Sequence, residues 1–161
     1  MKKYLLLLFV TVFFSCSDDL NKEVYRYEFY ENSDLSVVEV EWTYLKSGVI
    51  SDGNKVVFEY TYVAADDEQI ADDEYSESIF FEIDSSLDSF YFEGDDMLNA
   101  KTTLSKYCFC HFQDEEKNVV SVGFISGEKI SDNRWNINFD VTFYGDENRK
   151  FEKVFVLKQR N

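Results

Sequence analysis

Apolar and polar side chains alternate with a period of two over most of the chain after residue 22. The segment 133–144 is the clearest example, because every second residue is large and apolar: Trp135, Ile137, Phe139, Val141 and Phe143. This period is typical of strands in antiparallel sheets that bury one face and expose the other. The same reasoning applies to 24–30, 37–44 and 55–63, and it assigns Val38, Val40, Trp42 and Tyr44 to a buried face.

Further strands are predicted at 78–84, 89–93, 104–113, 118–126 and 150–158, joined by acidic turns such as SDGN at 51–54. We therefore expect one all-β domain over 23–161, an antiparallel β-sandwich or flattened β-barrel of about 8–9 strands. Alternation does not distinguish these two architectures. The firmest hairpin spans 133–158. Residues 64–78 form a loop or one helical turn, and 97–104 can hold a short helix.

The composition is that of a folded, strongly acidic protein. Aromatic residues make up 18% and hydrophobic residues 45% of the chain, which is enough apolar material for a core despite a net charge of −16. Without residues 1–15 the charge becomes −18, from 14 basic against 32 acidic residues. Such a surface repels nucleic acid and favours a cationic partner.

The start of the chain has the pattern of a secretory signal peptide. Lys2 and Lys3 precede an apolar run over 4–14, which as a helix would span only ~16 Å of a ~30 Å hydrocarbon core. Cys16 follows the small residue Ser15, and FFSC resembles the lipobox of bacterial lipoproteins, although Phe13 replaces the usual aliphatic residue. An ordinary secreted protein with a chance cysteine is the alternative.

The acidic SDD that follows Cys16 resembles the export signal of Bacteroidota-type surface lipoproteins. This resemblance implies cleavage after residue 15, lipidation of Cys16 and a lipidated tether over 16–22. It also implies anchoring in the outer membrane, at the cell surface. Two or more acyl chains give stable anchoring without a spanning helix. The alternative for SDD is a plain solvated linker.

The segment YCFCHF offers a weak metal or disulfide signal. In an extended strand Cys108 and Cys110 share one face and His111 lies on the other, so the three do not converge. A disulfide between cysteines two residues apart on a strand is poorly placed. We therefore interpret both cysteines as small buried hydrophobes. Because His111 is the only histidine and no nucleophile motif accompanies it, the sequence predicts neither an enzyme nor a cofactor.

Clustered carboxylates suggest at most a weak calcium site. The best candidates are Asp66, Asp67, Asp72 and Asp73, which lack the spacing of an EF-hand loop. Solvation of acidic turns explains them equally well.

The polar row opposite the apolar row of 133–144 is the candidate ligand face. It consists of Arg134, Asn136, Asn138, Asp140, Thr142 and Tyr144. Amides, a carboxylate, a guanidinium and an aromatic ring at ~6.6 Å intervals suit a sugar. Plain solvent exposure is the commoner explanation of such a row.

These features favour a non-enzymatic ligand-binding or structural lipoprotein of the cell envelope, with a glycan or peptide as ligand. The alternative is an acidic inhibitor or immunity protein that binds a cationic toxin or envelope hydrolase through its charge.

Overall fold

The computed structural model describes residues 22–39, 46–65, 74–108, 121–143 and 146–160. It contains nine strands and one short helix in the order β1 (Val24–Glu39), β2 (Lys46–Asp52), β3 (Lys55–Val63), β4 (Ser76–Asp84), β5 (Ser89–Glu93), α1 (Asp95–Asn99), β6 (Thr103–Tyr107), β7 (Val122–Ser131), β8 (Arg134–Phe143) and β9 (Glu147–Leu157). The predicted all-β class is confirmed. No helix within these ranges is long and apolar enough to cross a membrane.

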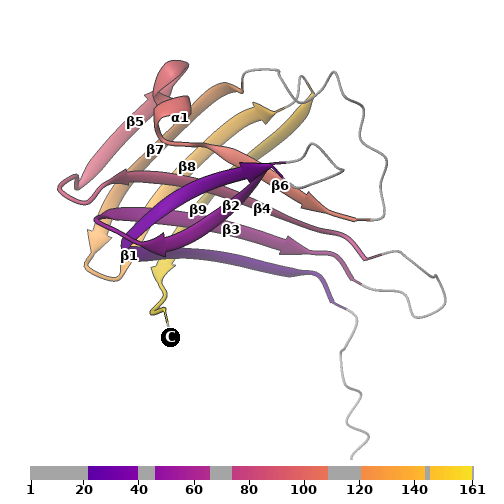
Figure 1. Cartoon of the computed structure of the whole chain (residues 1–161), viewed down its shortest axis with the longest axis horizontal. Helices are drawn as coiled ribbons and strands as arrows, with labels where there is room; N and C mark the ends of the chain where they lie inside the picture. The colour runs from indigo at the N-terminus through magenta and orange to yellow at the C-terminus, as the bar shows by residue number, and fades with distance from the viewer. Residues whose placement is uncertain (1–21, 40–45, 66–73, 109–120, 144–145, 161) are drawn as a thin grey trace, which may run out of the picture.

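All nine strands belong to one sheet with the order β5-β7-β8-β9-β1-β3-β4-β6, and β2 pairs with β1. Neighbouring strands are antiparallel except β1 and β9, which pair in parallel at two positions, Glu28↔Val156 and Phe29↔Leu157. The sheet does not close into a barrel. As Figure 1 shows, β7, β8 and β9 cross behind β3 and β4, so the sheet forms two layers like a sandwich.

The core lies between these layers and is largely aromatic. Phe58 of β3 stacks on Phe81 of β4 at 4.7 Å between ring centroids and meets Trp135 of β8 edge-on at 5.5 Å. Phe81 also contacts Phe139 of β8 at 6.4 Å. The five alternate apolar residues of β8 are all buried, as the sequence predicts. Burial of each such side chain stabilises the fold by ~1.5–3 kcal/mol.

β1 is one long strand rather than two, and it changes partners along its length. Its register with β3 shifts between Tyr30 and Ser33, and Asn32 has a positive φ of 50°, a conformation that Asn tolerates better than most residues. The first half of β1 pairs with β3 and β9. The second half, from Ser33, pairs with β2, and together they form what we call the β1–β2 arm.

The arm covers the outer face of β3 and β4. Leu35 of the arm packs with Val57 and Phe80 in a second, smaller core. Because Leu35 is the buried residue, Val38 lies on the opposite side of β1 and is 44% exposed, so the prediction of a buried Val38 is wrong. The predicted positions of Val40, Trp42 and Tyr44 lie outside the described residues.

Other boundaries differ from the sequence predictions. β2 was not predicted, since KSGVISD alternates poorly and contains a glycine. The helix begins at Asp95, two residues before the predicted start at residue 97, and it ends at Asn99. The hairpin of β8 and β9 is confirmed, with the pairing running from Arg134↔Val156 to Phe143↔Glu147.

Candidate functional site: the polar face of β5, β7, β8 and β9

The predicted polar row of β8 lies on the outer face of its layer. Arg134 and Asn138 are exposed, and Asn136, Asp140 and Thr142 are half-buried, whereas their neighbours point into the core. This placement follows from the pleat, because the apolar row fixes which side of β8 faces inward. Tyr144 lies outside the described residues.

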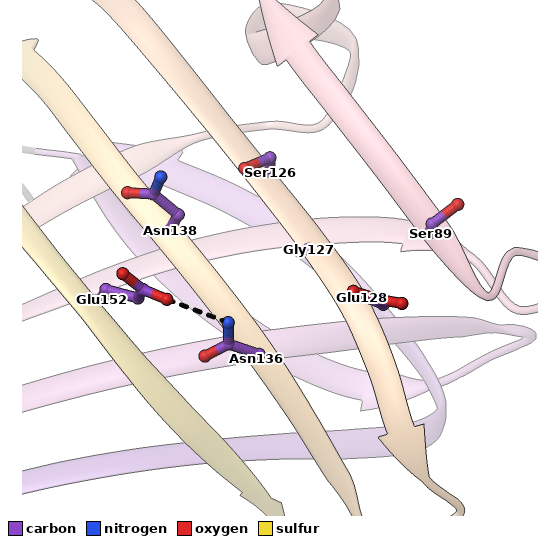
Figure 2. Close-up of a pocket in the computed structure, with 7 residues that line it drawn as sticks. All are labelled: Ser89, Ser126, Gly127, Glu128, Asn136, Asn138 and Glu152. Atoms are coloured by element: carbon purple, nitrogen blue, oxygen red, sulfur yellow. Dashed lines mark hydrogen bonds between the residues drawn. The ribbon is translucent and has the colours of Figure 1, made fainter.

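Two members of the row, Asn136 and Asn138, line a shallow hollow of about 360 Å³. Figure 2 shows them on β8 between residues of three other strands. The remaining lining residues are Ser89, Ser126, Gly127, Glu128 and Glu152. The structure therefore brings the two amides together with two carboxylates and two hydroxyls.

Strand register places these groups in two rows that run across the sheet. One row runs Tyr91, Ser126, Asn138, Glu152 over β5, β7, β8 and β9. The other contains Ser89, Glu128 and Asn136. Strands lie ~4.8 Å apart and successive outward residues ~6.6 Å apart, so the polar groups form a regular grid.

Most polar groups in the hollow have no partner among the described residues. The exceptions are Asn136 and Glu152, which bind each other: Asn136 Nδ2 donates to Glu152 Oε1 at 3.2 Å. The Asn138 amide and the Ser126 hydroxyl make no hydrogen bond to another described residue. They are therefore available to a ligand, with water as the competing partner.

Gly127 is needed on the inner side of this hollow. A Cβ atom there would lie 2.3 Å from Phe90 Cε1 and 2.7 Å from Ile137 Cδ1, so both of these side chains would have to move to make room for it. The absent side chain lets Phe90 of β5 pack tightly under β7, so β5 extends the polar face by one strand.

Asp140 and Arg134 are not part of the hollow. Asp140 binds Lys150 at 2.5 Å and also accepts a hydrogen bond from Asn148 Nδ2 at 3.2 Å. These contacts lower the pKa of Asp140 from its ordinary value and keep it ionised. Asp140 is thus already committed to an ion pair, and Arg134, the first residue of β8, does not line the hollow.

A stacked aromatic pair beside the hollow, of which Tyr91 is exposed and Phe124 half-buried, was missed by the sequence analysis. Tyr91 of β5 stacks on Phe124 of β7, with ring centroids 5.7 Å apart and an interplanar angle of 14°. Tyr91 is 57% exposed, and its cross-strand partner is Ser126 of the hollow. Alternation over 89–93 places Tyr91 on the outer face, but only the pairing of β5 with β7 shows that it lies next to Ser126, with Asn138 one strand further on.

The remaining predicted positions are not joined to this face. Cys16, Cys110 and His111 lie outside the described residues, as do all four calcium candidates, Asp66, Asp67, Asp72 and Asp73. Cys108 is half-buried and disulfide-bonded, so its interpretation as a small buried hydrophobe is wrong; its partner lies outside the described residues. Elsewhere in the described ranges, no group of three or more His, Cys, Asp or Glu side chains could hold a metal ion.

Comparisons of the chain with protein-family models, with curated proteins and with solved structures found no match.

Proposed function

We propose that this protein is a non-enzymatic binding lipoprotein of the outer membrane whose polar face binds a neutral glycan. The observation that carries the proposal is that the exposed ring of Tyr91, stacked on half-buried Phe124, lies beside a hollow in which the Asn138 amide and the Ser126 hydroxyl have no partner among the described residues. A sugar ring has an apolar face that packs on an aromatic ring and hydroxyls that both donate and accept hydrogen bonds.

The individual groups match this chemistry. Asn138 offers both a donor and an acceptor, and Ser126 beside it offers a hydroxyl. Glu128 and Glu152 accept hydrogen bonds from sugar hydroxyls and would repel an anionic ligand. The open, shallow form of the hollow suits one or two sugar units of a longer chain rather than a fully enclosed small molecule.

The anchor belongs to the proposal and rests on the pattern around Cys16. Mass spectrometry of the N-terminal peptide of the mature protein tests it, with Cys16→Ser as the variant. We expect a lipid-modified Cys16 at the N-terminus and loss of membrane association in Cys16→Ser. An unmodified N-terminal peptide that still contains residues 1–15 would refute the anchor.

Binding is tested on the full chain, solubilised in detergent, with an array of neutral glycans followed by calorimetric titration of the best ligand. Tyr91→Ala removes the ring on which the sugar would pack, and Asn138→Ala removes the amide that would hydrogen-bond it. We expect at least a ~10-fold loss of affinity from each. Tyr107→Ala is the matched control, because Tyr107 is 78% exposed on β6, which lies in the other layer. Unchanged affinity in both site variants would refute the proposal.

A further inference from the structure

A second hollow lies where β1 and β9 separate. The two strands pair only at Glu28↔Val156 and Phe29↔Leu157, and Figure 1 shows them diverging toward their N-terminal ends. The gap between the layers there holds a hollow of about 410 Å³. Its lining residues are Tyr25, Tyr27, Tyr60, Arg149, Lys150, Phe151 and Lys153.

The walls of this hollow are aromatic. The rings of Tyr27 and Tyr60 lie 5.4 Å apart, and Phe151 lies 5.2 Å from Tyr60 and 5.6 Å from Tyr27. All three rings also pack against each other or the core, so their positions are fixed before any ligand arrives. A flat or ring-shaped ligand would therefore meet a preformed wall.

The charge of the lining is opposite to that of the protein. Three cations and no carboxylate line the hollow, in a chain with twice as many acidic as basic residues. Arg149 is neutralised by Glu77 and Glu147. Lys150 is neutralised by Asp140.

Lys153 is the cation that remains. Within the described part of the chain it makes no ion pair, and its Nζ lies 5.9 Å from the ring centroid of Tyr27. It therefore supplies a positive charge without a fixed anion beside it.

Two tyrosine hydroxyls add to this charge. Five other tyrosines donate to a glutamate: Tyr25, Tyr30, Tyr62, Tyr75 and Tyr91. Tyr27, which is half-buried, and Tyr60, which is buried, make no hydrogen bond through their hydroxyls to another described residue. Burial raises the pKa of both phenols, so they remain protonated and can donate.

We propose that this hollow binds a small ring compound that carries one carboxylate. The ammonium of Lys153 and the hydroxyls of Tyr27 and Tyr60 would bind the carboxylate, and the aromatic wall would bind the ring. A volume of about 410 Å³ accommodates one such ring. The site shares no lining residue with the polar face and prefers the opposite ligand charge, so it goes beyond the function proposed above.

Matched pairs of probes test the preference for a carboxylate. Methyl glucuronide is compared with methyl glucoside, and 4-hydroxybenzoate with 4-hydroxybenzyl alcohol, by calorimetry on the full chain in detergent. We expect the carboxylate of at least one pair to bind ~10-fold more tightly than its neutral partner. The pair that shows this preference identifies the ligand as an acidic sugar or an aromatic acid. The preference should weaken as NaCl is raised from about 0.05 to about 0.5 M.

Substitutions at Lys153 locate the binding. Lys153→Met should reduce the preference to less than ~3-fold, and Lys153→Arg should retain most of it. Lys129→Met on β7 is the matched control and should bind like the unmodified chain. Equal binding of charged and neutral probes, no binding of either pair, or full preference in Lys153→Met would each overturn the proposal.

The same variants keep the two proposals apart. Tyr91→Ala should leave binding of the carboxylate probe unchanged, and Lys153→Met should leave binding of a neutral glycan unchanged. Loss of carboxylate binding in Tyr91→Ala would show that the probe binds the polar face and would overturn the second site alone.

Discussion

The carboxylate of Glu82 and the ammonium of Lys101 lie 2.7 Å apart, and both groups bind the backbone of Leu35. Leu35 N donates to Glu82 Oε2 at 2.8 Å, and Lys101 Nζ donates to Leu35 O at 2.6 Å. Glu82 is buried, at 8% exposure, on the face of β4 that the β1–β2 arm covers. This pair therefore fastens the arm to the rest of the sheet.

Removal of this contact should destabilise the fold. We expect Glu82→Ala to lower the free energy of unfolding by about 2 kcal/mol, because it leaves Leu35 N without a partner and removes the anion that neutralises Lys101. This loss is smaller than the loss expected for a fully buried ion pair, because the side chain of Lys101 is 41% exposed. Urea unfolding measures the loss, and Lys55→Met, which breaks the exposed pair with Asp84, should cost clearly less. Equal losses in the two variants would contradict a special role of Glu82.

Gly48 should resist substitution because Phe80 lies against it. A Cβ at Gly48 would lie 2.4 Å from the ring atoms Cγ and Cδ2 of Phe80. Gly48→Ala should therefore cost ~1–3 kcal/mol of stability through overpacking. A double-mutant cycle with Phe80→Leu provides the control, since the smaller side chain should absorb part of the cost. Strictly additive losses would mean that Phe80 is not what excludes the methyl group.

Acid should weaken the ion-pair network that joins β4, β6 and β9. Arg149 contacts Glu77 at 2.6 Å and Glu147 at 3.1 Å, and Lys106 also binds Glu147. Burial alone would raise the pKa of Glu147, but the hydrogen bonds and charges of Lys106 and Arg149 outweigh burial and lower it.

The sign of the pH effect follows from this lowered pKa. Ionised Glu147 stabilises the fold above its unfolded value of about 4.5, and the contribution is lost as the pH falls through the lower folded value. Urea unfolding from pH 7 to about pH 3 should therefore show a smaller loss of stability in Glu147→Gln than in the unmodified chain. Glu39→Gln, at an exposed position of the arm, is the control and should lose as much stability between pH 7 and about pH 3 as the unmodified chain. If the free energy of unfolding of Glu147→Gln fell with pH as steeply as that of the unmodified chain, the prediction would be contradicted.

Glycans bound to the polar face should be recovered intact. Glu128 and Glu152 both line the hollow, and a pair of carboxylates is also what a glycosidase needs. Because the hollow is shallow and Glu152 is hydrogen-bonded to Asn136, we expect these residues to contribute affinity only. Prolonged incubation followed by mass spectrometry tests this. Shortened products that disappear in Glu128→Gln or Glu152→Gln would make the protein a hydrolase.

Thiol counting tests the disulfide of Cys108. The chain has three cysteines, so a disulfide at Cys108 leaves one sulfur outside the bond. Labelling of the unreduced, denatured protein should detect no free thiol in a lipidated mature form and one in an unlipidated form. Two or three free thiols would contradict the disulfide.

Sequence alternation was sufficient for β8 because both of its faces carry a clear signal. Trp135 and Phe139 mark the core side, and Asn136 and Asn138 mark the outer side. It was insufficient for β1, where adjacent Val37 and Val38 allow either register. The burial of Leu35 against Phe80 decides between them, and this is a tertiary contact.

Both candidate sites depend on strand neighbours that alternation does not show. Tyr91 reaches Ser126 only because β5 pairs with β7, and Tyr27 reaches Lys153 only because β1 meets β9 in parallel. A pattern of period two identifies faces of strands and favours hairpins between successive strands. It carries no information about pairing between the first and last strands of a chain.

The interior position of β1 also determines how the protein would bear mechanical load. β1 is paired with β3 on one side and β9 on the other, and it begins two residues after the first described residue, Lys22. A pull along a tether at this end would shear hydrogen bonds and the Phe29 packing together, rather than peel an edge strand away one bond at a time. Shear of this kind spreads force over many bonds, which is what the proposed N-terminal anchor would require of the first strand.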